Sequence, residues 1–298
     1  MIGQTISYDK IGNFGTVLAC DGSGSRSRRR TFLVPLLCAS LLAAVPLFSQ
    51  HSDKKKEEFL LQANVIAVKP VSIGVTGTRR ATLSDGRLTH DASVQTVDEY
   101  EPTFETGRGT ELNFRDSYKY NIAAYRLDRL VNLRVVPVSV ERRIEGEKGA
   151  FTWWVDDVEM MEKERRAQGI ATPNEQEWND QASQVRIFNE LVYNTDANSG
   201  NFLITKQWKL VPIDFSRAFR TKKKLRVPQN LNNCVIDRRF YDGLREMNES
   251  VLLAAMKGVL RKAEVAGLLG RRDEILKYFD AQIAQAGEKA VVCDRPGH

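Results

Sequence analysis

Histidine and cysteine are scarce in this 298-residue chain, which holds three histidines and four cysteines. No two cysteines form a C-x-x-C pair, and the histidines are scattered, so no metal-ligand spacing exists. This scarcity argues against a zinc site and a disulfide framework, and against catalysis that depends on a histidine base. The sequence also lacks G-x-S-x-G, Walker A and G-x-G-x-x-G motifs, which removes most hydrolase and dehydrogenase hypotheses. The residues concerned are Cys20, Cys38, Cys234, Cys293, His51, His90 and His298.

A strong excess of one charge is lacking as well. The chain carries 44 basic and 38 acidic side chains, a formal net charge of +6. Residues 1–50 hold five basic and two acidic side chains, so the remaining body is close to neutral. This distribution argues against nucleic-acid binding as the main purpose of the fold. A hydrophobic content of 42% is ample for a core, in one large domain or two modest ones.

Long apolar runs are absent except at the N-terminus, where residues 31–48 contain no charged side chain. Four arginines lie just before this run, and small residues follow it near Ser49. A basic segment, an apolar segment and small residues are the parts of a secretory signal, and Arg29-Arg30 also resembles a twin-arginine export motif. We therefore predict that residues 1–50 are a leader.

The leader has two interpretations, a cleaved signal peptide and a retained membrane anchor. Pro35 and Pro46 weaken the anchor, for which eighteen residues is the lower limit of length. Either interpretation predicts an exported or membrane-anchored protein of the bacterial cell envelope, with membrane association through residues 31–48, and a cytoplasmic protein is the alternative. Residues 51–63 are predicted to be a charged linker.

The body begins with a β-like pattern. Short runs rich in Val, Ile and Thr extend from Asn64 to about Val97, separated by glycine turns. A helix is predicted to follow, capped by Asp116 and ending at about Leu130, because its apolar residues recur at helical spacing. Residues 135–144 and 150–155, joined by the turn GEKG, predict a β-hairpin.

Beyond Pro173 the pattern is mainly helical, with a predicted helix over Trp178 to Tyr193 and further helices near the C-terminus. Two short strands, residues 201–206 and 208–214, interrupt the helices. This order predicts an α+β, bilobal protein-kinase-like fold. A small β-rich N-lobe with one helix is expected at 64–156, and a larger helical C-lobe with the catalytic loop at 157–298.

The stretch 194–216, NTDANSGNFLITKQWKLVPIDFS, carries the pattern that points to chemistry. Asp196 is followed five residues later by Asn201, and Asp214 ends the next strand. Phosphoryl transfer needs one carboxylate to orient the attacking hydroxyl, and an amide oxygen and a second carboxylate to hold magnesium. The order D-x-x-x-x-N followed by D-F matches the protein-kinase template. The competing interpretation is a simple turn, because Asn, Asp, Ser and Gly are common turn residues.

These residues give the chain a resemblance to the phosphatidylinositol 3/4-kinase-like superfamily, which shares its catalytic core with protein kinases. The chain is similar in particular to bacterial exported or lipoprotein-like proteins. The resemblance covers roughly residues 65–290 and is carried by 117–144, 151–157 and 185–219. It implies ATP and Mg²⁺ as cofactors, bound in a cleft between the lobes, with the TWWVDD segment as the hinge that meets adenine.

By that resemblance Asp196 is the catalytic-loop aspartate, and Asn201 and Asp214 are the magnesium ligands. Trp154 is a candidate for the adenine pocket; adjacent strand residues face opposite ways, so at most one of Trp153 and Trp154 lines it.

The sequence departs from the family where a lysine and a glutamate should form an ion pair that fixes the phosphates. The matching positions hold Gln95 and Asn121, which can hydrogen-bond to each other but supply no positive charge. Arg79, Arg80 and Lys119 are the cations that could substitute. Gln95 and Arg80 are therefore the candidate phosphate-binding residues. The loop histidine common in lipid kinases is also missing.

A basic run follows Asp214 directly, from Arg217 to Arg226. It favours an anionic acceptor, such as a phospholipid headgroup or an acidic peptide, and the alternative is a solvated loop.

Three functions remain in competition. The first is an ATP- and Mg²⁺-dependent phosphotransferase acting on an unidentified hydroxyl of a protein, lipid or small molecule. The second is a pseudokinase that serves as a nucleotide-sensing or protein-interaction module at the membrane. The third is a structural exported protein in which the motif is only a turn.

Overall fold

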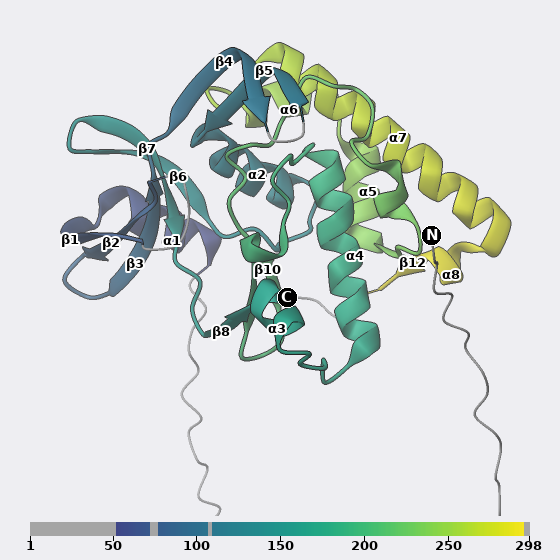
Figure 1. Cartoon of the computed structure of the whole chain (residues 1–298), viewed down its shortest axis with the longest axis horizontal. Helices are drawn as coiled ribbons and strands as arrows, with labels where there is room; N and C mark the ends of the chain where they lie inside the picture. Colours follow the sequence, from purple (N-terminus) through teal and green to yellow (C-terminus); the bar gives the residue numbers. More distant parts are fainter. Residues whose placement is uncertain (1–51, 72–76, 107–108, 295–298) are drawn as a thin grey trace, which may run out of the picture. The chain divides into compact units, whose positions relative to one another are not determined.

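A five-stranded antiparallel sheet forms the first part of the structure, a computed structural model that describes residues 52–71, 77–106 and 109–294. The strand order is β1-β2-β3-β7-β6 (Figure 1). Alternate residues of β2 and β3, among them Leu83 and Val94, are fully buried, as expected for a sheet with one covered face. The strands are β1 (Asn64–Pro70), β2 (Arg79–Ser84), β3 (Thr89–Gln95), β6 (Ser139–Ile144) and β7 (Glu147–Trp153).

The expected β-hairpin is confirmed in β6 and β7, with its turn placed slightly earlier than GEKG. Ile144 pairs with Glu147, which leaves a two-residue turn at Glu145 and Gly146. Both turn residues have positive φ, 52° and 88°, as a type I′ turn requires. Residues 147–149 belong to β7, and the first strand begins only at Ser139.

Helix α1 (Asp53–Gln62) replaces the linker that the sequence predicts at 51–63. Its charged residues make the segment resemble a linker, but Phe59 and Leu60 are buried. The Phe59 ring meets the Trp153 ring edge-on at 5.7 Å, which fixes the helix against β7. The linker prediction is therefore wrong, because two apolar residues suffice to dock a short charged helix.

Helix α2 (Lys119–Leu130) confirms the predicted helix but not its cap. The residue before its first turn is Tyr118, and Asp116 lies in the preceding strand instead. That strand is β5 (Gly109–Ser117), which pairs with β4 (Asp98–Thr106) in a separate two-stranded ribbon. This ribbon was not predicted from the sequence, because most of its side chains are polar and its described positions alternate little in burial.

A second sheet has the order β10-β9-β8 and is followed mainly by helices. The predicted strands at 201–206 and 208–214 are confirmed as β9 and β10, and the helix over Trp178–Tyr193 as most of α4. The elements are β8 (Val158–Met161), α3 (Glu162–Ala167), α4 (Glu175–Leu191), β9 (Phe202–Thr205), β10 (Leu210–Pro212), β11 (Ile236–Asp237), α5 (Arg238–Glu246), α6 (Glu249–Ala255), α7 (Lys262–Ala286), α8 (Glu288–Val291), β12 (Val292–Cys293) and two 3₁₀ turns at Ser199–Asn201 and Pro228–Leu231.

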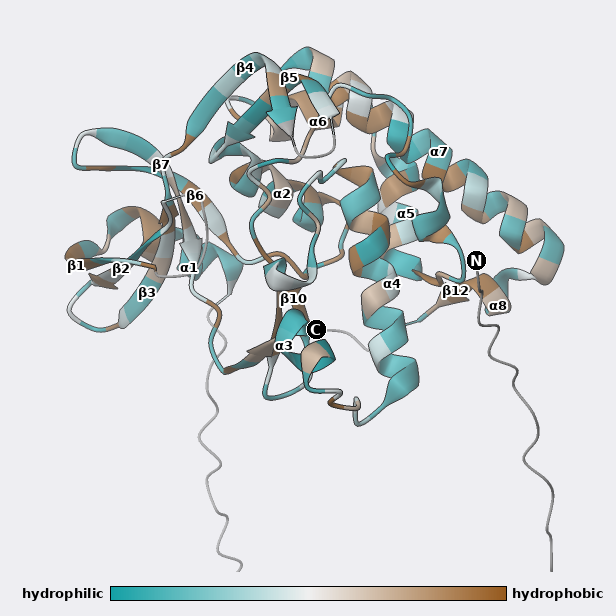
Figure 2. Cartoon of the chain, in the orientation of Figure 1, coloured by the Kyte–Doolittle hydropathy of each residue, from teal (hydrophilic) through white to brown (hydrophobic). Residues whose placement is uncertain are grey.

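One continuous hydrophobic core joins the five-stranded sheet to the helices. It runs from Val94 on β3 through Ile122 on α2 to Phe188 on α4 and Phe279 on α7, all fully buried. Helix α7 shows the expected mixture of hydrophobic and hydrophilic residues along its length (Figure 2). The core therefore holds β3, α2 and α4, the elements that surround the motif at 194–216, in one packed structure.

Candidate active site

The loop after α4 is held by a ladder of asparagine side chains. Asn194 is only 2% exposed, and its Nδ2 donates to Asn189 Oδ1 at 2.9 Å. Its Oδ1 accepts from the backbone N–H of Asp196 at 3.0 Å. The position of Asp196 is thereby tied to the last turns of α4.

Asp196 and Asn201 lie side by side within this loop. Asn201 Nδ2 donates to the backbone oxygen of Asp196 at 3.0 Å and lies 3.5 Å from its carboxylate Oδ2. Asn198 donates to the other carboxylate oxygen at 3.0 Å and accepts from the N–H of Gly200. The amide nitrogen of Asn201 is therefore used within the loop. Its Oδ1 accepts no hydrogen bond from any residue that the structure describes.

Asp214 reaches the same place from the other end of the β9–β10 hairpin. The N–H of Ile213 donates to the oxygen of Asn201 at 2.9 Å, which closes the open end of the hairpin. Asp214 has φ of 57°, a left-handed conformation that is uncommon for a residue other than glycine. Burial raises the pKa of its carboxyl, and Asp116 adds to this, while hydrogen bonds from Ser216 and Gln95 oppose it.

Gln95 and Asn121 form the hydrogen-bonded pair that the sequence suggests. Asn121 Nδ2 donates to Gln95 Oε1 at 2.5 Å, and Asn121 Oδ1 accepts from the N–H of Phe215 at 2.8 Å. The pair thus links β3 and α2 to the residue after Asp214. The backbone of Gln95 packs closely against Gly149 on β7, because a Cβ on Gly149 would lie 2.7 Å from the backbone oxygen of Gln95.

Arg80 contacts Trp154 and Asp91, not Asp196 or Asp214. The Arg80 guanidinium lies 4.4 Å from the centre of the Trp154 ring, and its Nε donates to Asp91 at 2.7 Å. Arg80 pairs with Ser93 across the sheet, so its side chain emerges on the same face as Gln95, two residues further along β3. No described contact joins Arg80 to Asp214. Its charge is offset by Asp91.

The neighbouring tryptophan, Trp153, is a core residue. Trp153 is 6% exposed and stacks on His90 with ring centres 3.7 Å apart. Residues 154–157 connect β7 to β8, and Asp156 there accepts from His90 at 2.8 Å. This connection is where the sequence places a hinge.

Two further charged residues belong to the site, and sequence reasoning missed them. Arg217 Nε donates to Asp116 Oδ2 at 2.8 Å. Burial alone lowers the pKa of Arg217, but Asp116, Asp196 and Asp214 outweigh this and raise it. Arg217 is therefore the cation shared by the three carboxylates. The sequence pointed to Arg217 only as the first residue of the basic run, and it pointed to Asp116 only as a helix cap.

The donor set suits a hard divalent cation. Asp214 offers a carboxylate and Asn201 an amide oxygen, which are ligands that Mg²⁺ prefers. Asp116 Oδ1 is buried without a hydrogen-bond partner among the described residues, which adds negative potential near Asp214. The described part of the chain holds no cluster of three or more His, Cys, Asp or Glu residues placed for a metal. With one carboxylate and one amide oxygen as protein ligands, a magnesium ion here would keep several waters, as it commonly does.

Solved structures of similar fold cover most of this chain. A hydra Fam20 structure with sugar matches with a TM-score of 0.62 and 14% identity, over 83% of this chain and 94% of that one. The Golgi casein kinase matches with a TM-score of 0.58 and 12% identity, over 82% and 78% of the two chains. The same kinase with Mn/ADP bound gives a TM-score of 0.57 and 12% identity, over 82% of this chain and 80% of that one.

This chain has the fold of an atypical kinase. No protein-family model and no curated protein matches the sequence. The bilobal α+β fold predicted from the sequence is thus confirmed at the level of structure, at identities that show the fold alone.

In this kinase-like fold, the basic run after Asp214 divides into buried and exposed residues. Arg220 is 8% exposed, and its Nε donates to Glu111 at 2.6 Å. Lys222, Lys223 and Lys224 are exposed. Residues 220–223 of the basic run pack directly on α7, because Gly267 and Gly270 have no side chains that would block this approach. A Cβ on Gly267 would lie 2.9 Å from the backbone oxygens of Arg220 and Thr221.

Substitution of Gly267 by alanine tests this close approach. Alanine in a helix interior is normally more stable than glycine by about 1 kcal/mol. Here the new methyl group would push the 220–221 backbone away, and we expect the free energy of unfolding to fall by about 1–2 kcal/mol. Urea denaturation followed by circular dichroism measures the change, and Gly267→Val should cost more than Gly267→Ala. An alanine variant more stable than the wild type would show that the segment does not rest on α7.

Proposed function

We propose that this protein is an ATP- and Mg²⁺-dependent phosphotransferase that acts on a hydroxyl group. The observation that carries the proposal is the convergence of Asp196, Asn201 and Asp214 at the open end of one β-hairpin. The kinase-like fold supports it, as does the Golgi casein kinase structure that contains Mn/ADP. Membership in the phosphatidylinositol 3/4-kinase-like superfamily is a finer proposal, supported by residues 185–219 of the sequence.

The chain's own residues have distinct tasks in this proposal. Asp196, fixed by Asn194, orients the acceptor hydroxyl and accepts its proton. Asn201 and Asp214 hold the cation, and Arg217 limits the repulsion among the nearby carboxylates. Bound Mg²⁺ neutralises the charge that develops on the transferred phosphate. Gln95 and Arg80 are the proposed phosphate contacts, and Trp154 the proposed adenine contact.

Asp196→Asn separates catalysis from binding. A positioned acid–base group contributes about 10²–10⁴-fold to a rate, so turnover should fall by at least about 10²-fold. Nucleotide binding should persist, because Asn201 and Asp214 remain. Release of ADP measures turnover, and the thermal shift with Mg²⁺ and ATP measures binding. Equal turnover in the variant and the wild type would remove Asp196 from the mechanism.

A pseudokinase is the second candidate, and the Gln95–Asn121 pair favours it. Neither side chain is charged, so the pair lacks the cation that nucleotide phosphates attract. The same experiment discriminates between the two functions. Nucleotide binding without turnover in the wild type supports the pseudokinase, and absence of a shift with any nucleotide contradicts both.

We propose export or membrane anchoring on the sequence of residues 31–48, which lie outside the described residues. Among residues 52–71, 77–106 and 109–294, no helix has the length and hydrophobicity needed to cross a bilayer. A reporter fused at the C-terminus, followed by fractionation, tests the compartment. A reporter found only in the cytoplasmic fraction would contradict the proposal.

A further inference from the structure

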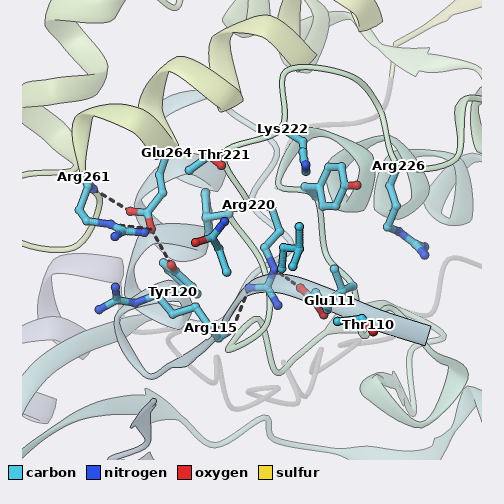
Figure 3. Close-up of a pocket in the computed structure, with 15 residues that line it drawn as sticks. Thr110, Glu111, Arg115, Tyr120, Arg220, Thr221, Lys222, Arg226, Arg261 and Glu264 are labelled. Atoms are coloured by element: carbon cyan, nitrogen blue, oxygen red, sulfur yellow. Dashed lines mark hydrogen bonds and ion pairs between the residues drawn. The ribbon is translucent and has the colours of Figure 1, made fainter. Parts of the chain in front are cut away.

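A cavity lies beside the loop that carries Asp196. Its volume is about 430 Å³. It is lined by strand β5, the loop after α4, the basic run after Asp214 and the start of α7 (Figure 3). Thr195, the residue before Asp196, is part of its wall. The size falls in the range of small-molecule sites.

The cavity is strongly basic. Five cationic side chains line it, against the two carboxylates of Glu111 and Glu264. Both carboxylates are already engaged, Glu111 by Arg220 and Glu264 by Arg261 and Tyr120 (Figure 3). The cationic residues are Arg115, Arg220, Lys222, Arg226 and Arg261.

Two of these cations lack a counter-charge within the described residues, whereas Arg220 is paired with Glu111. Lys222 and Arg226 have no ion-pair partner there. The guanidinium of Arg220 is buried in the wall, where Nε donates to Glu111 and Nη1 to the backbone oxygen of Arg115 at 2.7 Å. Its Nη2 is buried and has no hydrogen-bond acceptor among the residues that the structure describes.

A phosphate group matches this chemistry best. The guanidinium of Arg226 presents paired N–H donors that fit two phosphate oxygens. Thr110, Tyr120 and Tyr193 also line the cavity, and the hydroxyls of Thr110 and Tyr120 already donate to Glu105 and Glu264. The volume of about 430 Å³ suits a small molecule.

We propose that this cavity binds the phosphate of a small phosphorylated acceptor whose free hydroxyl lies toward Asp196. The inference rests on the proposed function and names its acceptor class. In the reaction the acceptor oxygen forms a bond to the γ-phosphorus of ATP, and the bond from that phosphorus to the β–γ bridging oxygen breaks. ADP leaves, and the hydroxyl proton passes to Asp196 and then to solvent.

Binding of glycerol 3-phosphate and of inorganic phosphate tests the proposal by isothermal titration calorimetry, with neither nucleotide nor Mg²⁺ present. Wild type should bind both, and Arg226→Gln should weaken binding at least about tenfold. Lys222→Gln should also weaken it, and Arg226→Lys should restore part of the affinity. Lys223→Gln is the matched control, because this exposed lysine lies in the same segment but does not line the cavity.

The outcomes are distinct. Absence of phosphate binding in the wild type, or equal loss in Lys223→Gln and Arg226→Gln, overturns the proposal. Binding only to vesicles that contain phosphatidic acid, or only to an acidic peptide, overturns the small-molecule acceptor in favour of that ligand. The titration contains no nucleotide, so its result does not depend on turnover. If the wild type binds phosphate but releases no ADP in the separate assay with ATP and Mg²⁺, the phosphotransferase is rejected and the anion site remains.

Discussion

Replacing Asp214 by asparagine is expected to abolish Mg²⁺-dependent nucleotide binding and to lower turnover by about 10³-fold or more. A metal ion contributes several kcal/mol of charge stabilisation, and each 1.4 kcal/mol is a factor of ten. Asparagine has the same size as aspartate and keeps one of the two side-chain oxygens, but it carries no negative charge. The thermal shift with Mg²⁺ and ATP measures binding, and ADP release measures turnover.

The same variant should fold at least as well as the wild type without ligand. Burial raises the pKa of the Asp214 carboxyl, which means that its ionised form is disfavoured in the folded protein. Removing that charge removes this cost. Asp242→Asn, an exposed change on α5, is the matched control and should leave binding and turnover unchanged. A nucleotide shift that survives in Asp214→Asn would show that the cation is held elsewhere.

The largest stability effect is expected from Arg271→Met. Arg271 is 0% exposed, and its Nε donates to the backbone oxygen of Leu191 at the end of α4 at 2.7 Å. Its Nη1 donates to the backbone oxygens of Arg220, at 2.9 Å, and Lys222. Burial lowers the pKa of the guanidinium to about 9, so it remains charged at neutral pH.

Methionine would fill much of the volume but would leave three backbone oxygens without this donor. Breaking a buried charged network of this kind costs about 3–5 kcal/mol in the free energy of unfolding. Urea denaturation measures it, and Lys277→Met, an exposed change on the same helix, is the control. If Arg271→Met does not fold, Arg271→Lys should show an intermediate loss. A loss below about 1 kcal/mol in Arg271→Met would mean that water satisfies these carbonyls.

The sequence predicted the parts of the site that are local. Asp196, Asn201 and Asp214 belong to one loop and one hairpin, so their spacing alone brings them together. Gln95 and Asn121 were predicted as a pair through the family resemblance, which places a lysine and a glutamate at these positions, and the structure joins them by a hydrogen bond.

The parts that depend on distant contacts could not be predicted. Arg217 and Asp116 are 101 residues apart, and the ribbon that carries Asp116 lacks a readable alternation of apolar residues. The basic cavity draws its walls from residue 110 to residue 264. Helix α1 was missed for a different reason, because its composition resembles that of a linker and only Phe59 and Leu60 are buried.

The uncharged link between Gln95 and Asn121 has a consequence for how the site responds to its surroundings. A lysine–glutamate ion pair at this position would weaken as dissolved ions screen it, and would break if either group lost its charge. Two amides have no net charge to screen and do not titrate in the physiological range. The register of α2 against β3 and Phe215 is therefore expected to stay constant across wide changes in ionic strength and pH.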